Sequence, residues 1–204
     1  MLDGLFKVIK KLKVKNIIIS RQGEISENYK RFEEIVRKKK TKLIIVNKGD
    51  KLHIEKDFYI DIIWPNNSNF INENILNNNS IVCQIRYRKF SMLFTGDIEE
   101  IAENEILKEL KKETLKSDIL KVGHHGSKSS STKAFIEAVS PKIAMIGVGL
   151  NNKFGHPNQG VLKRLEEINC KVYRTDIMGE ICCVVDRKGN ILRITKYANQ
   201  NYET

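Results

Sequence analysis

The chain has 204 residues, which is long enough for one domain with a sizeable hydrophobic core. Hydrophobic residues make up 41% and charged residues 30% of the sequence, a balance typical of globular proteins rather than disordered ones. The apolar runs are too short for a membrane span, and the lysine-spaced residues after Met1 do not resemble a secretory signal. We therefore expect a globular chain without a membrane-spanning segment.

The formal net charge of +11 is concentrated near the start of the chain. Residues 1–60 hold 16 basic and 8 acidic side chains. Of the positive residues, 27 are Lys and only 9 are Arg, and the chain also has 28 Ile and 19 Asn, a combination typical of an AT-rich coding sequence. The charge is therefore compatible with a plain solvated surface as well as with a nucleic-acid partner.

The four cysteines show no C-x-x-C spacing, and three of them lie in apolar, strand-like runs. They are Cys83, Cys170, Cys182 and Cys183. A disulfide framework or a zinc ribbon is therefore not expected.

The first quarter of the chain predicts alternating helices and strands. Apolar residues at positions 5, 8, 9 and 12 share one helix face, and the β-branched run at 16–20 predicts a short strand. Ser26 resembles a helix start for a segment that ends near residue 40, and residues 43–46 predict a buried strand. This alternation favours an α/β fold.

After residue 50 the pattern changes to strand pairs and then returns to alternation. Strands are predicted over 51–55 and 58–64, and an Asn-rich loop over 66–79. The remaining predicted elements are the hairpin 81–87/90–95, helix 98–112, strand 119–122, helix 132–139, strand 142–146, helix 159–168 and strands 171–174, 180–185 and 191–195. We expect one domain over residues 1–204, with a frayed tail at 198–204.

Three polar clusters follow apolar strands, at the points where loops begin. They contain Asp97, the pair His124 and His125, and His156, each next to glycine in the sequence. Taken alone, the position of Asp97 predicts an N-cap of the next helix, and that of each His predicts a hydrogen-bonded loop residue. Three of the four histidines lie in such turns, however, and imidazole with carboxylate is a donor set suited to zinc and similar metals. His53, in an amphipathic strand, receives no role.

The same residues carry a family resemblance over nearly the whole chain. Leu93-Phe94-Thr95-Gly96-Asp97, then Leu120-Lys121-Val122-Gly123-His124-His125-Gly126-Ser127, then Phe154-Gly155-His156-Pro157 occur in this order. The ordered set is similar to the metallo-β-lactamase-fold domain of ComEC-type DNA-uptake (competence) proteins, and Asn78-Asn79-Ser80 fits the same pattern.

The resemblance implies an αββα sandwich with a hydrolytic site that holds one or two zinc or manganese ions. It makes Asp97 a bridging ligand and, with His125, a catalytic residue, while His124, His125 and His156 become candidate metal ligands. Ser127, Ser129 and Ser130 would offer donors to a phosphate near the start of the helix at 132–139.

One departure from the family pattern limits this expectation. The principal metal motif, H-x-H-x-D-H, is absent from the sequence, and Met1-Leu2-Asp3-Gly4-Leu5 resembles the stretch that follows it. We therefore expect an N-terminally truncated domain that lacks its first strands, binds metal weakly or not at all, and self-associates through an uncovered sheet edge. Its location is then either the cytoplasm or the exterior soluble part of a membrane transport protein.

Three functional hypotheses follow. The first is a hydrolase-like domain whose complete relatives cut phosphodiesters in DNA and whose activity is impaired here. The second is a non-catalytic DNA-binding module in which Lys7–Lys15 and Arg37–Lys40 hold the DNA backbone. The third is an assembly subunit that completes its site with residues from another chain.

Overall fold

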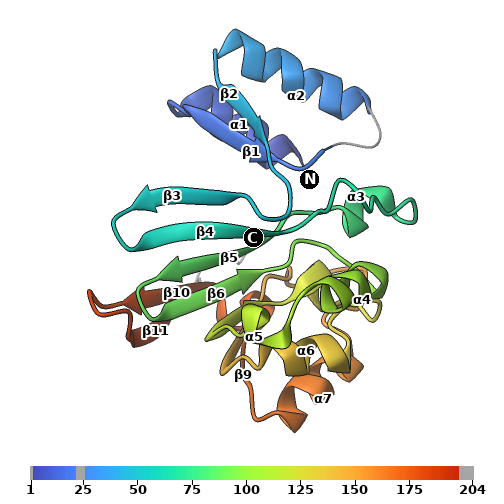
Figure 1. Ribbon diagram of the computed structural model, residues 1–204, viewed down its shortest axis with the longest axis vertical. Helices are drawn as coiled ribbons and strands as arrows, with labels where there is room; N and C mark the ends of the chain where they lie inside the picture. The colour runs from blue at the N-terminus through green and yellow to red at the C-terminus, as the bar shows by residue number, and fades with distance from the viewer. Residues whose placement is uncertain (1, 22–25, 198–204) are drawn as a thin grey trace.

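The computed structural model describes residues 2–21 and 26–197 (Figure 1). Its first unit contains helices α1 (Leu2–Lys11) and α2 (Glu27–Lys38) and the parallel strands β1 (Asn16–Ile19) and β2 (Lys42–Ile45). The apolar helix positions found in the sequence pack together here, with Phe6 and Ile9 of α1 against Phe32 and Val36 of α2. Ser26 caps α2 as expected, because its hydroxyl accepts the Tyr29 N–H at 3.2 Å.

A seven-stranded sheet forms the centre of the molecule. Its strands are β3 (Lys51–Glu55), β4 (Phe58–Trp64), β5 (Val82–Tyr87), β6 (Phe90–Phe94), β7 (Ile119–Lys121), β8 (Ile143–Ile146) and β9 (Lys171–Arg174). They lie in chain order across the sheet. Pairing is antiparallel from β3 to β6 and parallel from β6 to β9.

Helices follow the strands of the parallel half. They are α4 (Glu100–Glu109), α5 (Lys112–Leu115), α6 (Lys133–Val139) and α7 (Gln159–Glu167), which lie together beside the sheet (Figure 1). Leu93, Leu120 and Ala144 of the sheet share one buried core with Phe135 of α6 and Leu165 of α7. Long crossovers of this kind are what parallel pairing requires, so the expected α/β class is confirmed.

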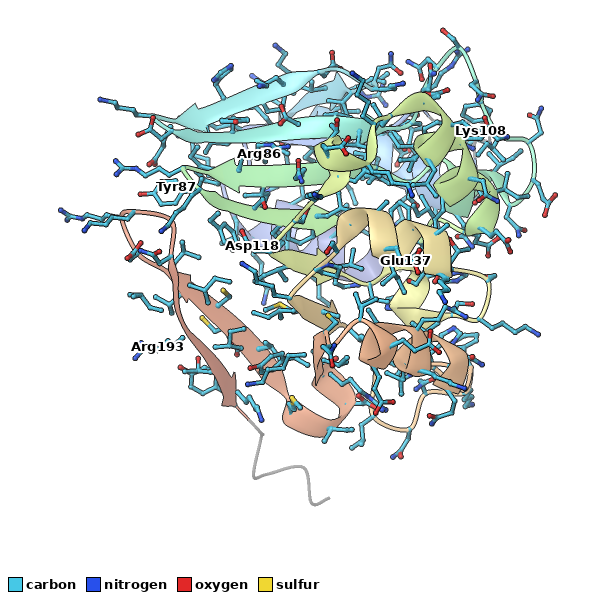
Figure 2. All side chains as sticks on the ribbon, turned by 60° about the horizontal axis from the view of Figure 1, so that its bottom comes forward. Arg86, Tyr87, Lys108, Asp118, Glu137 and Arg193 are labelled. Carbon is cyan, nitrogen blue, oxygen red and sulfur yellow. The ribbon has the colours of Figure 1, made fainter. Side chains whose placement is uncertain are left out.

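The last two strands do not join the central sheet. Strands β10 (Glu180–Val185) and β11 (Ile191–Tyr197) form a separate hairpin, reached through the short helix α8 (Thr175–Met178). In Figure 2 this hairpin, with Arg193, stands apart from the helices of the parallel half, among them α6 with Glu137. The hairpin turn packs closely on the β5–β6 turn, because a Cβ at Gly189 would lie 2.8 Å from the Tyr87 carbonyl oxygen.

Two predicted elements differ from the structure. The Asn-rich stretch ends in a short helix, α3 (Ile75–Asn78), which Asn79 supports by donating from Nδ2 to the Ile71 and Ile75 carbonyl groups. The helix predicted over 98–112 is interrupted, because the backbone of Leu110 is extended and the chain restarts as α5, whose Leu115 is fully buried. The predicted frayed tail lies outside the described residues. Within the described ranges, no helix is both long and apolar enough to cross a bilayer.

Candidate metal and hydrolytic site

The site residues gather because β6, β7 and β8 are parallel neighbours. Phe94, Lys121 and Met145 are aligned in register, so the loops that follow these strands emerge at the same edge of the sheet. Asp97 lies in the first loop, His125 in the second and His156 in the third. Ligand sites of parallel sheets form at this carboxyl edge.

Gly96 makes the turn that places Asp97. Its φ is +56°, and a Cβ there would come within 2.7 Å of the Ser80 side chain. The Gly96 carbonyl group accepts the His124 N–H at 3.0 Å, which ties the first loop to the second.

Asp97 does not cap the helix that follows. The N-cap position of α4 is Glu99, and no side chain caps it, so the N-cap interpretation of Asp97 is wrong. No hydrogen bond to the Asp97 carboxylate occurs in the described part of the chain, and its Oδ1 lies 3.7 Å from His125 Nε2. The carboxylate is thus available to a ligand.

His125 is oriented by the third loop. Its Nδ1 lies 2.6 Å from the carbonyl oxygen of Gly147, which can only accept, so Nδ1 carries the proton of this bond. In the neutral ring, Nε2 then presents a lone pair toward Asp97. A carbonyl group that fixes one ring nitrogen while the other faces a candidate ion is the usual arrangement around metal-binding histidines.

His124 lies in the same turn, η1 (Gly123–Gly126), and faces Glu99. Its Nδ1 is buried and makes no hydrogen bond. It lies 3.3 Å from Glu99 Oε1, which is within ion-pair distance. Both His124 and His125 have left-handed backbones, with φ values of 45° and 56°, a strained conformation that concentrates at functional sites.

His156 completes the group of histidines. Its ring centroid lies 5.9 Å from that of His124, edge to face. Burial, and then the neighbouring His124 and His125, lower the pKa of His156 below its usual value. The lowered pKa favours the neutral ring, the form in which imidazole binds metals.

The three predicted phosphate-binding serines hold the loop itself. Ser127 and Ser129 hydroxyl groups lie 3.1 Å apart, Ser129 donates to Glu99 at 3.2 Å, and Ser130 donates to the Gly123 carbonyl group at 2.9 Å. The backbone N–H groups of Ser131 and Thr132, at the start of α6, both donate to the buried carboxylate of Glu103. These two N–H groups are therefore taken by Glu103, and the phosphate-binding role of Ser127, Ser129 and Ser130 stays a prediction.

Two residues near the site were missed in the sequence. Glu99 links the loops, since it also accepts from Asn74 Nδ2 at 2.7 Å. The Lys121 side chain is partly buried, and burial lowers its pKa while the nearby Asp97 carboxylate opposes this change. Their position in the sequence could have indicated both residues, because each lies within two residues of one of the polar clusters that follow apolar strands.

The residues fit one ion in part. A nitrogen donor about 2.0–2.1 Å and an oxygen donor about 2.0–2.2 Å from one zinc ion are at most about 4.3 Å apart, and His125 Nε2 and Asp97 Oδ1 meet this limit at 3.7 Å. No group of three or more His, Cys, Asp or Glu side chains able to hold an ion occurs over residues 2–21 and 26–197. Asp97 and His125 are therefore close enough to share one ion, but the described residues do not bring together the larger ligand set that was expected.

Comparison with known proteins places the chain in a family. The chain is 35% identical over 175 residues to "ComE operon protein 3" of Bacillus subtilis (strain 168), a match that covers 85% of this chain. The chain is a homologue of the ComEC-type competence proteins. It is also 32% identical over 124 residues to "Competence protein ComA" of Neisseria gonorrhoeae, and 37% identical over 106 residues to "Recombination protein 2" of Haemophilus influenzae.

These matches cover 59% and 52% of this chain respectively. The chain spans only 22%, 18% and 13% of the lengths of the three ComEC-type relatives, in the order given. No protein-family model matches the chain. Among solved structures, "CmlA beta-hydroxylase E377D mutant" aligns with 78% of this chain and 38% of its own, at 13% identity and a TM-score of 0.48. That likeness is too distant to carry an argument.

Proposed function

We propose that the chain is a hydrolase-type domain that binds a divalent metal and acts on phosphodiesters of DNA. The observation that carries the proposal is the approach of Asp97 and His125 at the carboxyl edge of the parallel strands. Homology to competence proteins supports DNA as the substrate class.

Each site residue has a task in this proposal. Asp97 Oδ1 and His125 Nε2 hold a zinc or manganese ion, and the Gly147 carbonyl group keeps the His125 ring in the required orientation. When bound, such an ion supplies Lewis-acid polarisation of a phosphoryl oxygen. In this proposal His156 and the partly buried Lys121 contact a phosphate of the substrate or exchange a proton with it.

We expect the affinity for metal to be weak and the activity of this chain to be low. Structural and catalytic zinc sites use three or four protein ligands, and the described residues bring together two. The printed sequence contains no H-x-H-x-D-H motif that would add ligands.

Metal titration tests the proposal. Calorimetric titration with Mn²⁺ or Zn²⁺ should show one weak site in the parent chain, and Asp97→Asn should weaken it at least about tenfold, because a charged ligand is replaced by a neutral one. Asp57→Asn is the matched control, since Asp57 lies in the distant β3–β4 turn beside Arg88. Equal affinity in all three proteins would contradict the role of Asp97.

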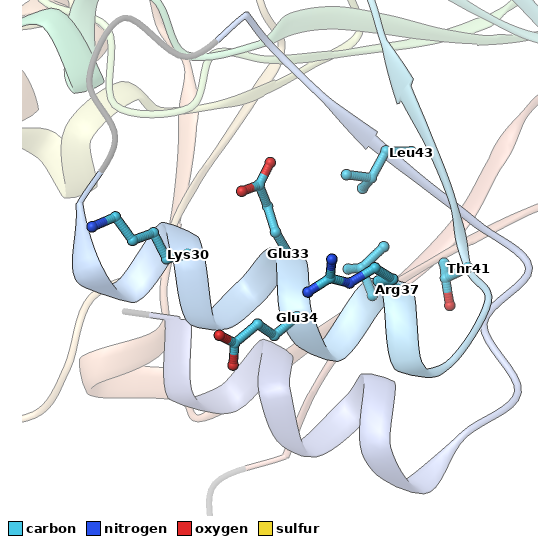
Figure 3. A pocket seen from close by; sticks show the side chains of 7 residues that line it. Lys30, Glu33, Glu34, Arg37, Thr41 and Leu43 are labelled. Carbon is cyan, nitrogen blue, oxygen red and sulfur yellow. The ribbon is translucent and has the colours of Figure 1, made fainter.

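A second function is favoured by the first unit of the fold. The two basic segments lie side by side, because α1 packs on α2 and Lys39 Nζ donates to the Lys10 carbonyl group at 2.8 Å. Most of their lysines are exposed. The unit also has a hollow of about 610 Å³ lined by both signs of charge, Glu33 and Glu34 beside Lys30 and Arg37 (Figure 3).

Salt dependence separates this function from the first. If the unit holds DNA through its phosphates, Lys11→Glu with Lys38→Glu should weaken duplex binding and reduce the slope of log K against log salt by about 2. Lys108→Glu with Lys133→Glu, on α4 and α6, changes the charge equally and is the control. A metal-dependent cleavage that survives the first pair of substitutions would leave hydrolysis as the function of the chain.

A further inference from the structure

Phe154 is a large apolar ring that the fold presents to solvent. It lies in the loop between β8 and α7, and 80% of its surface is exposed. Asn152 ties the loop around it together, because its Oδ1 accepts the backbone N–H groups of Phe154 at 3.2 Å and His156 at 3.0 Å. Asn152 Nδ2 also donates to the His156 carbonyl group at 2.8 Å. These hydrogen bonds fix the loop conformation in which the Phe154 ring is exposed.

The ring also continues the candidate site outward. Phe154 stacks on His156 with centroids 5.8 Å apart and an interplanar angle of 19°, and His156 in turn lies edge-on to His124. Phe154 and His156 line a cavity of about 390 Å³ together with His125, Val148 and Thr175. This volume lies within the range of about 300–1,000 Å³ that small-molecule sites occupy.

We propose that Phe154 stacks against a nucleobase of single-stranded nucleic acid and so positions the strand at the Asp97–His125 site. The inference rests on the proposed function and names the form of its substrate. A flat apolar ring backed by a second ring offers the surface that base stacking uses, and the open face can be covered only by a group from outside the loop. Lys153, exposed and adjacent in sequence, supplies a positive charge for the backbone next to the stacked base.

Single-stranded substrate fits this loop better than a duplex. In a duplex each base is already stacked and paired, so an aromatic ring gains a partner only after the base has been extruded. In a single strand the base faces are open, and aromatic stacking is tolerant of sequence because every base has such a face.

Fluorescence anisotropy with two probes tests the proposal. One probe is labelled oligothymidylate of about 12 nucleotides, and the other is an abasic strand of the same length, both in EDTA so that metal-dependent cleavage does not interfere. Phe154→Ala should weaken binding of oligothymidylate about tenfold and leave binding of the abasic strand unchanged. Phe154→Trp should retain the affinity of the parent chain for oligothymidylate.

Leu150→Ala is the matched control, because Leu150 lies in the same loop and is 74% exposed. It should leave both affinities unchanged. The proposal fails if the parent chain binds the two probes equally or binds neither, or if Phe154→Ala weakens both alike. Failure here leaves the metal titration of Asp97→Asn unaffected, so the two proposals are judged separately.

Discussion

At the residue scale, Glu103 is the buried charge whose protonation bears most directly on stability. Its side chain is 1% exposed and accepts the N–H groups of Ser131 and Thr132. Burial raises the pKa of Glu103, and the hydrogen bonds and Arg164 only partly oppose this effect. The folded chain therefore binds the Glu103 proton more tightly than the unfolded chain does.

The pH dependence of stability follows from that difference. The contribution of protonated Glu103 is fully present below the unfolded pKa, about 4.3, and is lost as the pH rises through the higher folded pKa. The free energy of unfolding should fall by at most about 1.4 kcal/mol for each pH unit in this window. Urea unfolding from acidic to neutral pH should show this fall in the parent chain, and Glu103→Gln should remove it.

Glu137→Gln is the control, because Glu137 is exposed on α6 (Figure 2). Its unfolding curves should follow those of the parent chain at every pH. If Glu103→Gln also follows the parent chain, the carboxyl group is ionised throughout, and its two N–H partners outweigh its burial.

Residue-level roles were only partly predictable from the sequence. Asp97, His125 and His156 were selected as candidates because each follows an apolar strand and lies next to glycine, and their metal-binding roles stay predictions. Glu99 was missed because a glutamate at a helix start is usually an exposed residue that favours the helix dipole. Its place in the site depends on Asn74 and Ser129, which lie in other loops and reach it only in the folded chain.

At the scale of elements, the η1 turn depends on Gly126. Its φ is +80°, and a Cβ there would lie 2.6 Å from the Pro157 Cβ, so the second and third site loops are in close contact. Gly126→Ala should lower the free energy of unfolding by about 1–3 kcal/mol and also weaken metal binding, because His125 moves with the turn.

Gly149→Ala provides the comparison, since nothing lies within 4 Å of a Cβ at that position. Urea unfolding and metal titration of both variants check the prediction. A Gly126→Ala protein with the stability and metal affinity of the parent chain would show that the two loops can separate without affecting the site.

Regular elements were predicted where the apolar period was clear, and the errors have tertiary causes. Leu110 fits the period of the preceding helix, but the chain turns there so that Leu115 can enter the core. Helix α3 has poor helix formers, and buried contacts support it, including a 2.6 Å hydrogen bond from Trp64 Nε1 to the Asn78 carbonyl group. Neither the burial of Leu115 nor the Trp64–Asn78 hydrogen bond could be predicted from the local sequence.

At the scale of the whole molecule, alternating strands and helices were sufficient to predict the α/β class and polar clusters at strand ends, while the parallel pairing of β6 to β9 came from the structure. The separation of the β10–β11 hairpin was not predictable, because it rests on the contact of Gly189 with the β5–β6 turn, a pair of segments about a hundred residues apart.

The single domain and the self-association through a sheet edge stay predictions. Strand β3, at one edge of the sheet, carries exposed Lys51 and Glu55 that oppose such pairing.

The change from antiparallel to parallel pairing at β6 also orders events during synthesis. Strands β3 to β6 pair with their neighbours in sequence, so a growing chain that has emerged to residue 94 already holds every strand of its antiparallel half. Every residue of the candidate metal site comes later, from Asp97 to His156. A ribosome must therefore add some sixty more residues to a half-built sheet before the nascent chain contains both Asp97 and His156.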